Sequence, residues 1–201
     1  TCNEVLLMRH LLRKSTDRRE RAYLINHFLD SFKGTVYRQT MFAEFEKKAH
    51  EMAEQGRSLT AKSLNEMYYE LNKEYFGPDM VVDKDIEVEW ARIPHFYTPF
   101  HVYQYATGFS AAVAIASMIR KEGQPAVDRY MKFLSSGGSD YPIELLKIAG
   151  VDMSKPDAIK TGLDVFGLAF LCNTDFYVIC TIFFPLMREY QKFECSHNRA
   201  L

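Results

Sequence analysis

Residues 93–112, IPHFYTPFHVYQYATGFSAA, gather the side chains of this chain that are best suited to chemistry on a substrate. Those side chains are His95, Tyr97, His101, Tyr103 and Tyr105. Phenol and imidazole groups can donate hydrogen bonds to an oxyanion in a dry cleft, where such donors are worth far more than in water. The alternative interpretation is a set of core aromatic residues whose polar ends are satisfied. Composition alone favours the core interpretation.

The position of these side chains depends on where the following helix begins. Thr98 can cap a helix, and Pro99 suits the first helical position because its missing N–H would have had no partner there. The pair predicts a helix from residue 99 to residue 122. In that helix His101 and Tyr105 fall on one face, and the two earlier side chains of the segment lie in the entering loop.

The remaining chain also shows helical periodicity. Apolar residues at helical spacing predict helices over residues 3–14, 17–33, 36–55, 61–75, 124–134, 143–149 and 155–166. Asp17 and Thr60 are candidate N-caps, and Gly34 is a candidate helix end. The acidic run 79–89 and the glycine-rich run 135–142 read as loops. Almost nothing before residue 170 alternates with period two, so the predicted fold class is all-α.

Composition limits the classes of partner. The chain has 201 residues, of which 47% are hydrophobic, with 25 basic and 26 acidic side chains and a net charge of −1. These values describe an ordinary globular chain with a sizeable core. A net charge close to zero provides no field that would attract nucleic acid or an anionic membrane. Neither partner is therefore expected.

The cysteines show no spacing that would indicate a metal or redox site. They are Cys2, Cys172, Cys180 and Cys195. Without a C-x-x-C pair, free thiols in a reducing cytoplasm are expected. Residues 165–187 form a long apolar run, but Asn173 and Asp175 interrupt it. Because polar groups are costly inside a bilayer, a buried or poorly ordered end is favoured over a membrane span.

Several catalytic motifs are missing from the sequence. It contains no H-E-x-x-H, so it cannot assemble the zinc site of that motif alone, and it contains no G-x-S-x-G. The other histidines are scattered at no metal-ligand spacing. The chain opens on Thr1 in the middle of an apolar helical pattern. We therefore expect a fragment whose beginning lies elsewhere.

Four separated stretches resemble one family. They are residues 1–7 (TCNEVLL), 28–46 (FLDSFKGTVYRQTMFAEFE), 95–108 (HFYTPFHVYQYATG) and 137–153 (GGSDYPIELLKIAGVDM). In order, they are similar to the C-terminal half of oligoendopeptidase F, one of the thimet-oligopeptidase-like zinc metallopeptidases. The resemblance covers residue 1 to about residue 165. It implies an all-α, multi-helix half of a cleft enzyme.

The resemblance also implies where zinc is bound. The family holds zinc with the two histidines of H-E-x-x-H and with a glutamate in a motif similar to E-x-x-S-T-x-N-E. Only the end of that second motif, Thr1-Cys2-Asn3-Glu4, is present. The ligand would precede Thr1 by three positions, and Glu4 matches the second glutamate, which is not a ligand. The resemblance therefore implies zinc in the parent enzyme and no metal ligand in this chain.

The resemblance assigns to this chain the wall of the substrate cleft that lies opposite the zinc ligands. His95 matches a family histidine, and Tyr103 and Tyr105 are the first choices for the tyrosines that stabilise the oxyanion. Tyr97 and His101 are assigned to substrate binding, although His101 stands where relatives usually carry a tyrosine. These roles follow from the resemblance rather than from spacing.

Two functions are thus in competition. The first is the C-terminal part (residues 1–166) of a cytoplasmic zinc endopeptidase that hydrolyses internal bonds of oligopeptides. It would need the missing N-terminal half as its partner, and it would be inactive alone. Residues 167–201 then form an atypical apolar tail, which a frameshift, an erroneous join near residue 166 or a divergent terminus would explain. The second is a non-catalytic helical interaction module, tethered to a membrane through residues 165–187.

Overall fold

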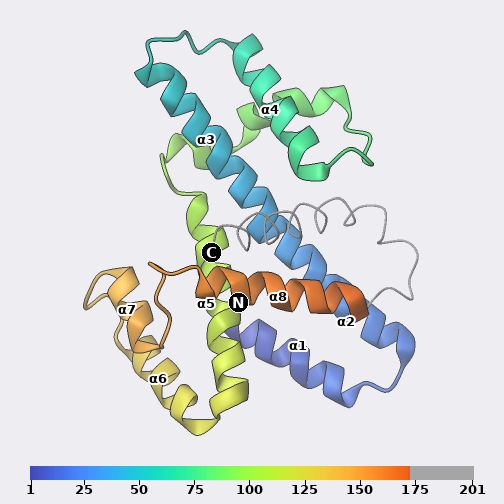
Figure 1. The fold of residues 1–201 in the computed structure, drawn as a ribbon, viewed down its shortest axis with the longest axis vertical. Helices are drawn as coiled ribbons and strands as arrows, with labels where there is room; N and C mark the ends of the chain where they lie inside the picture. The colour runs from blue at the N-terminus through green and yellow to red at the C-terminus, as the bar shows by residue number, and fades with distance from the viewer. Residues whose placement is uncertain (173–201) are drawn as a thin grey trace, which may run out of the picture. The chain divides into compact units, whose positions relative to one another are not determined.

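The structure, a computed structural model, describes residues 1–172 (Figure 1). These residues form helices joined by turns, and no strand occurs among them, which confirms the predicted all-α class. The described chain divides into two compact units. Unit 1 comprises Thr1–Val36 and the described residues from Gln104 onward, and unit 2 comprises Tyr37–Tyr103.

Unit 1 is organised around an aromatic core. Its helices are α1 (Cys2–Lys14), α2 (Arg18–Phe32), most of α5 (Tyr103–Glu122), α6 (Gln124–Ser135), α7 (Pro142–Ile148) and α8 (Asp157–Cys172). The fully buried ring of Phe32 stacks on Phe166, with 4.5 Å between ring centroids. The same ring meets Phe109 edge-on at 5.4 Å. Helices α2, α5 and α8 therefore share one core.

Small residues allow α8 to approach α5 closely. A Cβ added at Gly162 of α8 would lie 3.6 Å from the Ser110 hydroxyl oxygen of α5. Ser110 is buried, and its hydroxyl donates to the carbonyl oxygen of Ala106 at 2.9 Å. The buried hydroxyl is thereby satisfied within its own helix.

The turn between α1 and α2 follows the local sequence. The side chain of Asp17 accepts a hydrogen bond from the backbone N–H of Glu20 at 2.8 Å, which confirms the predicted N-cap. The Glu20 carboxylate in turn accepts from the hydroxyl of Ser15 at 2.6 Å. These bonds satisfy a free N–H at the start of α2 and fix the entry of the chain.

The predicted helix end at Gly34 is wrong. The chain continues through a π-helical turn, η1 (Lys33–Tyr37), directly into α3 (Arg38–Glu54). Gly34 does not adopt the positive φ that would end a helix, whereas Gly56, Gly77 and Gly123 do. Val36 is buried within this turn, so packing extends the helical path where the local sequence would allow a stop.

Unit 2 packs α3 and α4 (Ala61–Phe76) with two 3-10 helices, η2 (Lys84–Arg92) and η3 (Pro94–Tyr97). Its buried core consists of Met41, Phe42, Phe45, Tyr68, Leu71, Ile93 and Val102. The predicted cap Thr60 accepts from the N–H of Ser63 at 3.1 Å. Gly77, with φ 78°, ends α4. Part of the run predicted as an acidic loop is η2, whose first turn is capped by Asp83.

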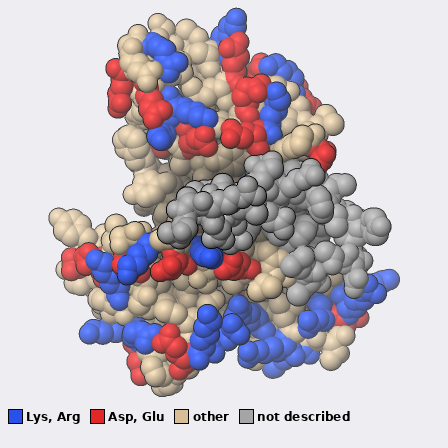
Figure 2. Space-filling view, in the orientation of Figure 1, with Lys and Arg blue, Asp and Glu red and all other residues tan. Residues whose placement is uncertain are grey.

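The surface of unit 2 balances its charges locally. Figure 2 shows acidic and basic side chains close to one another over this unit. Several form ion pairs one helical turn apart, among them Lys48 with Glu44 at 2.6 Å and Lys73 with Glu70 at 3.0 Å. Such exposed pairs contribute little individually.

We predict that Phe32→Ala destabilises the chain by about 3–5 kcal/mol, because it removes the ring at the centre of the unit 1 core and leaves a cavity. Urea unfolding of the 201-residue chain, followed by circular dichroism, measures the change. Val81→Ala is the control, since Val81 is 95% exposed and should change stability by less than about 0.5 kcal/mol. Similar losses for both variants would contradict this core assignment.

Candidate functional site

The segment from Pro94 to Val102 does not have the predicted local structure. It begins with η3 and passes through a turn, and α5 begins only at Tyr103. The prediction of a helix start at Pro99 is therefore wrong. The reason lies in Phe100, whose φ of 60° places it in the left-handed region and stops a right-handed helix from forming there.

Three apolar side chains anchor this segment in the core of unit 2. Ile93 is 7% exposed and Val102 is 1% exposed, at the two ends of the segment. Between them, the ring of Phe96 lies 5.5 Å from that of Phe42 and 5.3 Å from that of Phe45. The backbone is thereby held on both sides of His95, Tyr97 and His101.

The anchoring brings two of the predicted site residues together. The imidazole rings of His95 and His101 stack, with 5.9 Å between their centroids and 17° between their planes. His95 is exposed and His101 is half-buried. The predicted shared helix face of His101 and Tyr105 is wrong, because His101 precedes the helix. His101 pairs with His95 instead.

The three predicted tyrosines occupy different surroundings. Tyr97 ends η3 and is 85% exposed. Tyr103 is the first residue of α5 and is half-exposed, whereas Tyr105 lies in the part of α5 that belongs to unit 1. The three side chains are all accessible, which is unlike the buried rings of the alternative core interpretation.

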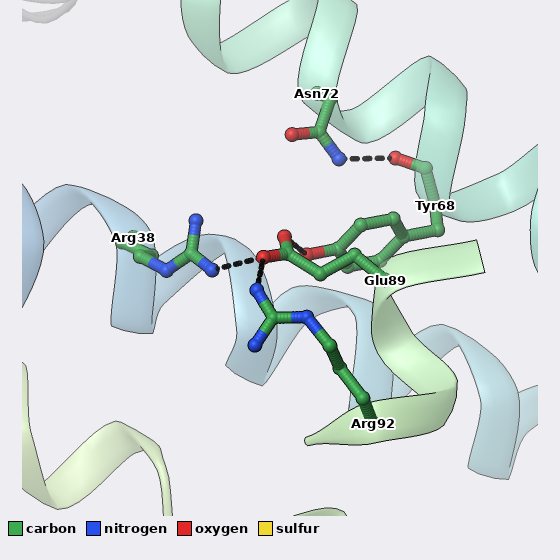
Figure 3. Close-up of polar contacts among 5 residues, drawn as sticks. All are labelled: Arg38, Tyr68, Asn72, Glu89 and Arg92. Carbon is green, nitrogen blue, oxygen red and sulfur yellow. Dashed lines mark hydrogen bonds and ion pairs between the residues drawn. The ribbon is translucent and has the colours of Figure 1, made fainter. Parts of the chain in front are cut away.

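A polar cluster forms around the buried carboxylate of Glu89 in unit 2, and sequence reasoning missed it (Figure 3). The Glu89 carboxylate of η2 accepts from the Arg38 guanidinium of α3 at 2.6 Å and from the Tyr68 hydroxyl of α4 at 2.7 Å. It also pairs with Arg92. Nothing in the acidic run marks Glu89 as different from its neighbours, since its partners are far away in sequence.

The cluster fixes the protonation states of its members. Burial opposes ionisation of Glu89, but hydrogen bonds from Tyr68 and Arg38 and the nearby arginine charges outweigh burial, so its pKa is lowered. The pKa of Tyr68 is raised by burial and by its hydrogen bond to the Glu89 charge. Glu89 is therefore charged and Tyr68 protonated at neutral pH.

The side-chain amide of Asn72, which lies near Tyr68 on α4, has only some of its hydrogen bonds satisfied. The side-chain N–H of Asn72 donates to the Tyr68 carbonyl oxygen at 2.8 Å, but its own amide oxygen has no hydrogen-bond partner within the described chain. Asn72 is 1% exposed, so its hydrogen bond lies within α4 and away from solvent.

Residues 1–172 contain no cluster of three or more metal-binding side chains. No group of three or more His, Cys, Asp or Glu side chains within that range is arranged to hold a metal ion. The stacked pair of His95 and His101 supplies only two such groups. These residues therefore do not fit a zinc centre, and no step through a metal follows from their geometry.

Most of the chain matches a family of peptidases. Residues 1–165 match peptidase family M3, and the chain belongs to this family. This confirms the resemblance read from the sequence. The chain is 55% identical over 166 residues to the oligopeptidase PepF of Bacillus subtilis, covering 83% of the chain and 25% of that protein. It is 45% identical over 166 residues to the chromosomal oligoendopeptidase F of Lactococcus lactis, covering 83% and 28%.

The three-dimensional fold gives the same result. The chain resembles the crystal structure of oligoendopeptidase-F from Enterococcus faecium with a TM-score of 0.84 and 45% sequence identity. The match covers 87% of this chain and 33% of that one. The chain thus spans about a quarter to a third of the length of these relatives.

We predict that Glu89→Gln lowers the free energy of unfolding by about 1–3 kcal/mol at pH 7, because two arginines lose their charged acceptor. The folded-state pKa of Glu89 is lowered, so its contribution is complete above the unfolded pKa of about 4.3 and is lost as pH falls through the folded pKa. The difference in the free energy of unfolding between the wild type and Glu89→Gln should therefore shrink below about pH 4. Urea unfolding at several pH values measures it.

The control is Glu70→Gln, which breaks the exposed Lys73 pair on α4 and should change stability by about 0–1 kcal/mol. A Glu89→Gln effect as small as this, or one that is equal at pH 3 and pH 7, would contradict the role assigned to the buried carboxylate.

Proposed function

We propose that this chain is part of a zinc-dependent metalloendopeptidase that hydrolyses internal peptide bonds of oligopeptides. In this proposal the chain supplies groups that bind the substrate and stabilise the oxyanion. The observation that carries it is the stacked pair of His95 and His101 on an anchored segment, inside the region that belongs to peptidase family M3. Relatives named oligopeptidase and oligoendopeptidase support the substrate class.

The proposed chemistry needs hydrogen-bond donors held in place before the reaction. His95, Tyr103 and Tyr105 would donate to the negative charge that develops on the carbonyl oxygen of the cleaved bond. Tyr97 and His101 would contact the substrate backbone. Because Ile93, Phe96 and Val102 fix the backbone in the core, His95 on this segment needs little reorganisation to act.

Zinc belongs to the proposed parent enzyme rather than to the described residues. When bound, zinc would generate the attacking hydroxide and polarise the carbonyl. The described residues do not form a ligand set, and the chain covers 25% of the Bacillus relative. We therefore place the zinc ligands in the N-terminal part of an M3 peptidase, which is the partner that this chain requires.

The organisation of the chain follows from this proposal. Residues 1–166 would be the C-terminal helical part of the catalytic domain, and residues 167–201 an atypical tail.

We propose a cytoplasmic location and no nucleic-acid partner. Among the described helices, none has the length and apolar character needed to cross a membrane. Most of the run 165–187, on which the tethered-module alternative depends, lies outside the described residues.

We predict that the oxyanion role of His95 appears in a full-length chimera, in which residues 1–166 replace the matching part of the Bacillus relative. His95→Ala should lower kcat about ten- to a thousandfold, because a preorganised donor is lost. Cleavage of a quenched fluorescent peptide measures the rate. His10→Ala is the matched control, since His10 is an exposed histidine of α1 outside the segment. An unchanged rate for His95→Ala would return His95 to a structural role.

We also predict that the 201-residue chain alone does not cleave the same peptide, with or without added zinc. The described residues lack a group of three metal-binding side chains, so they cannot hold the ion in a reactive position. Turnover that requires zinc and is abolished by a chelator would refute this prediction. The chimera provides the positive control for the assay.

A further inference from the structure

The turn before His101 contains an unusual backbone conformation. Phe100 is the only non-glycine residue with a positive φ among the described residues, at 60°. For a bulky L-residue this left-handed conformation costs about 1–2 kcal/mol unless its surroundings stabilise it. Phe100 lies directly between Pro99 and His101. The conformation therefore determines how the second imidazole leaves the turn.

One buried carboxylate stabilises this conformation. The backbone N–H of Phe100 donates to Oε1 of Glu46 at 2.7 Å. Glu46 lies on α3 and is 5% exposed, so its charge is largely withdrawn from water. A hydrogen bond in such a place is stronger than one exposed to water. It acts on the backbone of the strained residue itself.

The same helix makes further contacts at the turn and before it. Four residues beyond Glu46, the ring of His50 lies 4.8 Å from the ring of Phe100. Before the turn, Phe42 and Phe45 of α3 hold Phe96. Helix α3 thus contacts the chain both before the turn and at Phe100. The position of His101 relative to His95 depends on these contacts.

We propose that Glu46 is a positioning residue, whose carboxylate holds the Phe100 N–H and thereby keeps the strained turn that stacks His101 on His95. This positioning role rests on the proposed function, in which His95 and His101 contact the substrate. Glu46 itself does not touch the substrate. Without its carboxylate, Phe100 relaxes to a negative φ and the turn that leads to His101 rearranges.

The geometric part is tested on the 201-residue chain by proton NMR. Nuclear Overhauser contacts between the His95 and His101 rings should be present in the wild type and in Glu46→Gln, which keeps an acceptor oxygen of the same length. They should be lost in Glu46→Ala. Glu46→Asp keeps the charge but is one methylene too short, and it should also lose them, which covers the case in which the alanine variant does not fold. Ring contacts that persist in Glu46→Asp or Glu46→Ala overturn the proposal.

The functional part is tested in the full-length chimera. Glu46→Ala or Glu46→Asp should lower kcat about ten- to a hundredfold, as expected for a misplaced site group, and Glu46→Gln should retain most of the rate. Glu44→Ala is the control. That carboxylate also lies on α3, but it accepts from Tyr75 at 2.9 Å and pairs with Lys48, away from the turn. It should leave kcat within about twofold while lowering stability.

The two proposals fail in different ways. If His95→Ala lowers kcat and neither the alanine nor the aspartate variant at Glu46 does, the positioning role is refuted and the proposed function stands. If none of them lowers kcat, both are refuted. If Glu46→Gln loses as much rate as Glu46→Ala, an acceptor at this position is not what holds the turn, and the positioning role is again refuted.

Discussion

The hydrogen bonds and ion pairs of the Glu89 carboxylate hold together the segments from which unit 2 is built. Glu89 belongs to η2, Arg38 to α3 and Tyr68 to α4, so a single buried charge joins three elements. A buried carboxylate without partners would be strongly unfavourable, and so the three elements must dock together. The chain then leaves η2 at Ile93, immediately before the segment that carries the two imidazoles.

The geometry of η3 explains why this segment is anchored and accessible at once. In a 3-10 helix, residues three apart lie on the same side, so Ile93 and Phe96 both face the core. His95 and Tyr97 then point away from it and are exposed. After the turn, Val102 returns to the core and closes the segment. Chemistry-bearing side chains are thus presented on a backbone with buried contacts at both ends.

Local signals predicted most of the helices, and the failures have physical reasons. Thr60 and Asp17 act as caps because their side-chain bonds reach only three residues along the chain. Gly34 was predicted to end a helix, but burial of Val36 keeps the turn helical. Thr98-Pro99 has the composition of a helix start. The conformation of Phe100, held from α3, overrides it.

The sequence by itself determined the all-α class, most helix boundaries and the resemblance to a peptidase family, because those depend on neighbours within a few turns or on ordered motifs. Only the tertiary structure decided that His101 stacks on His95 rather than sharing a helix with Tyr105. It also decided the bonds that act at a distance, such as Phe100 to Glu46, 54 residues apart. Glu89 and Arg38 are separated by 51 residues. No local rule spans such separations, because these contacts exist only after α3 has packed against the rest of unit 2.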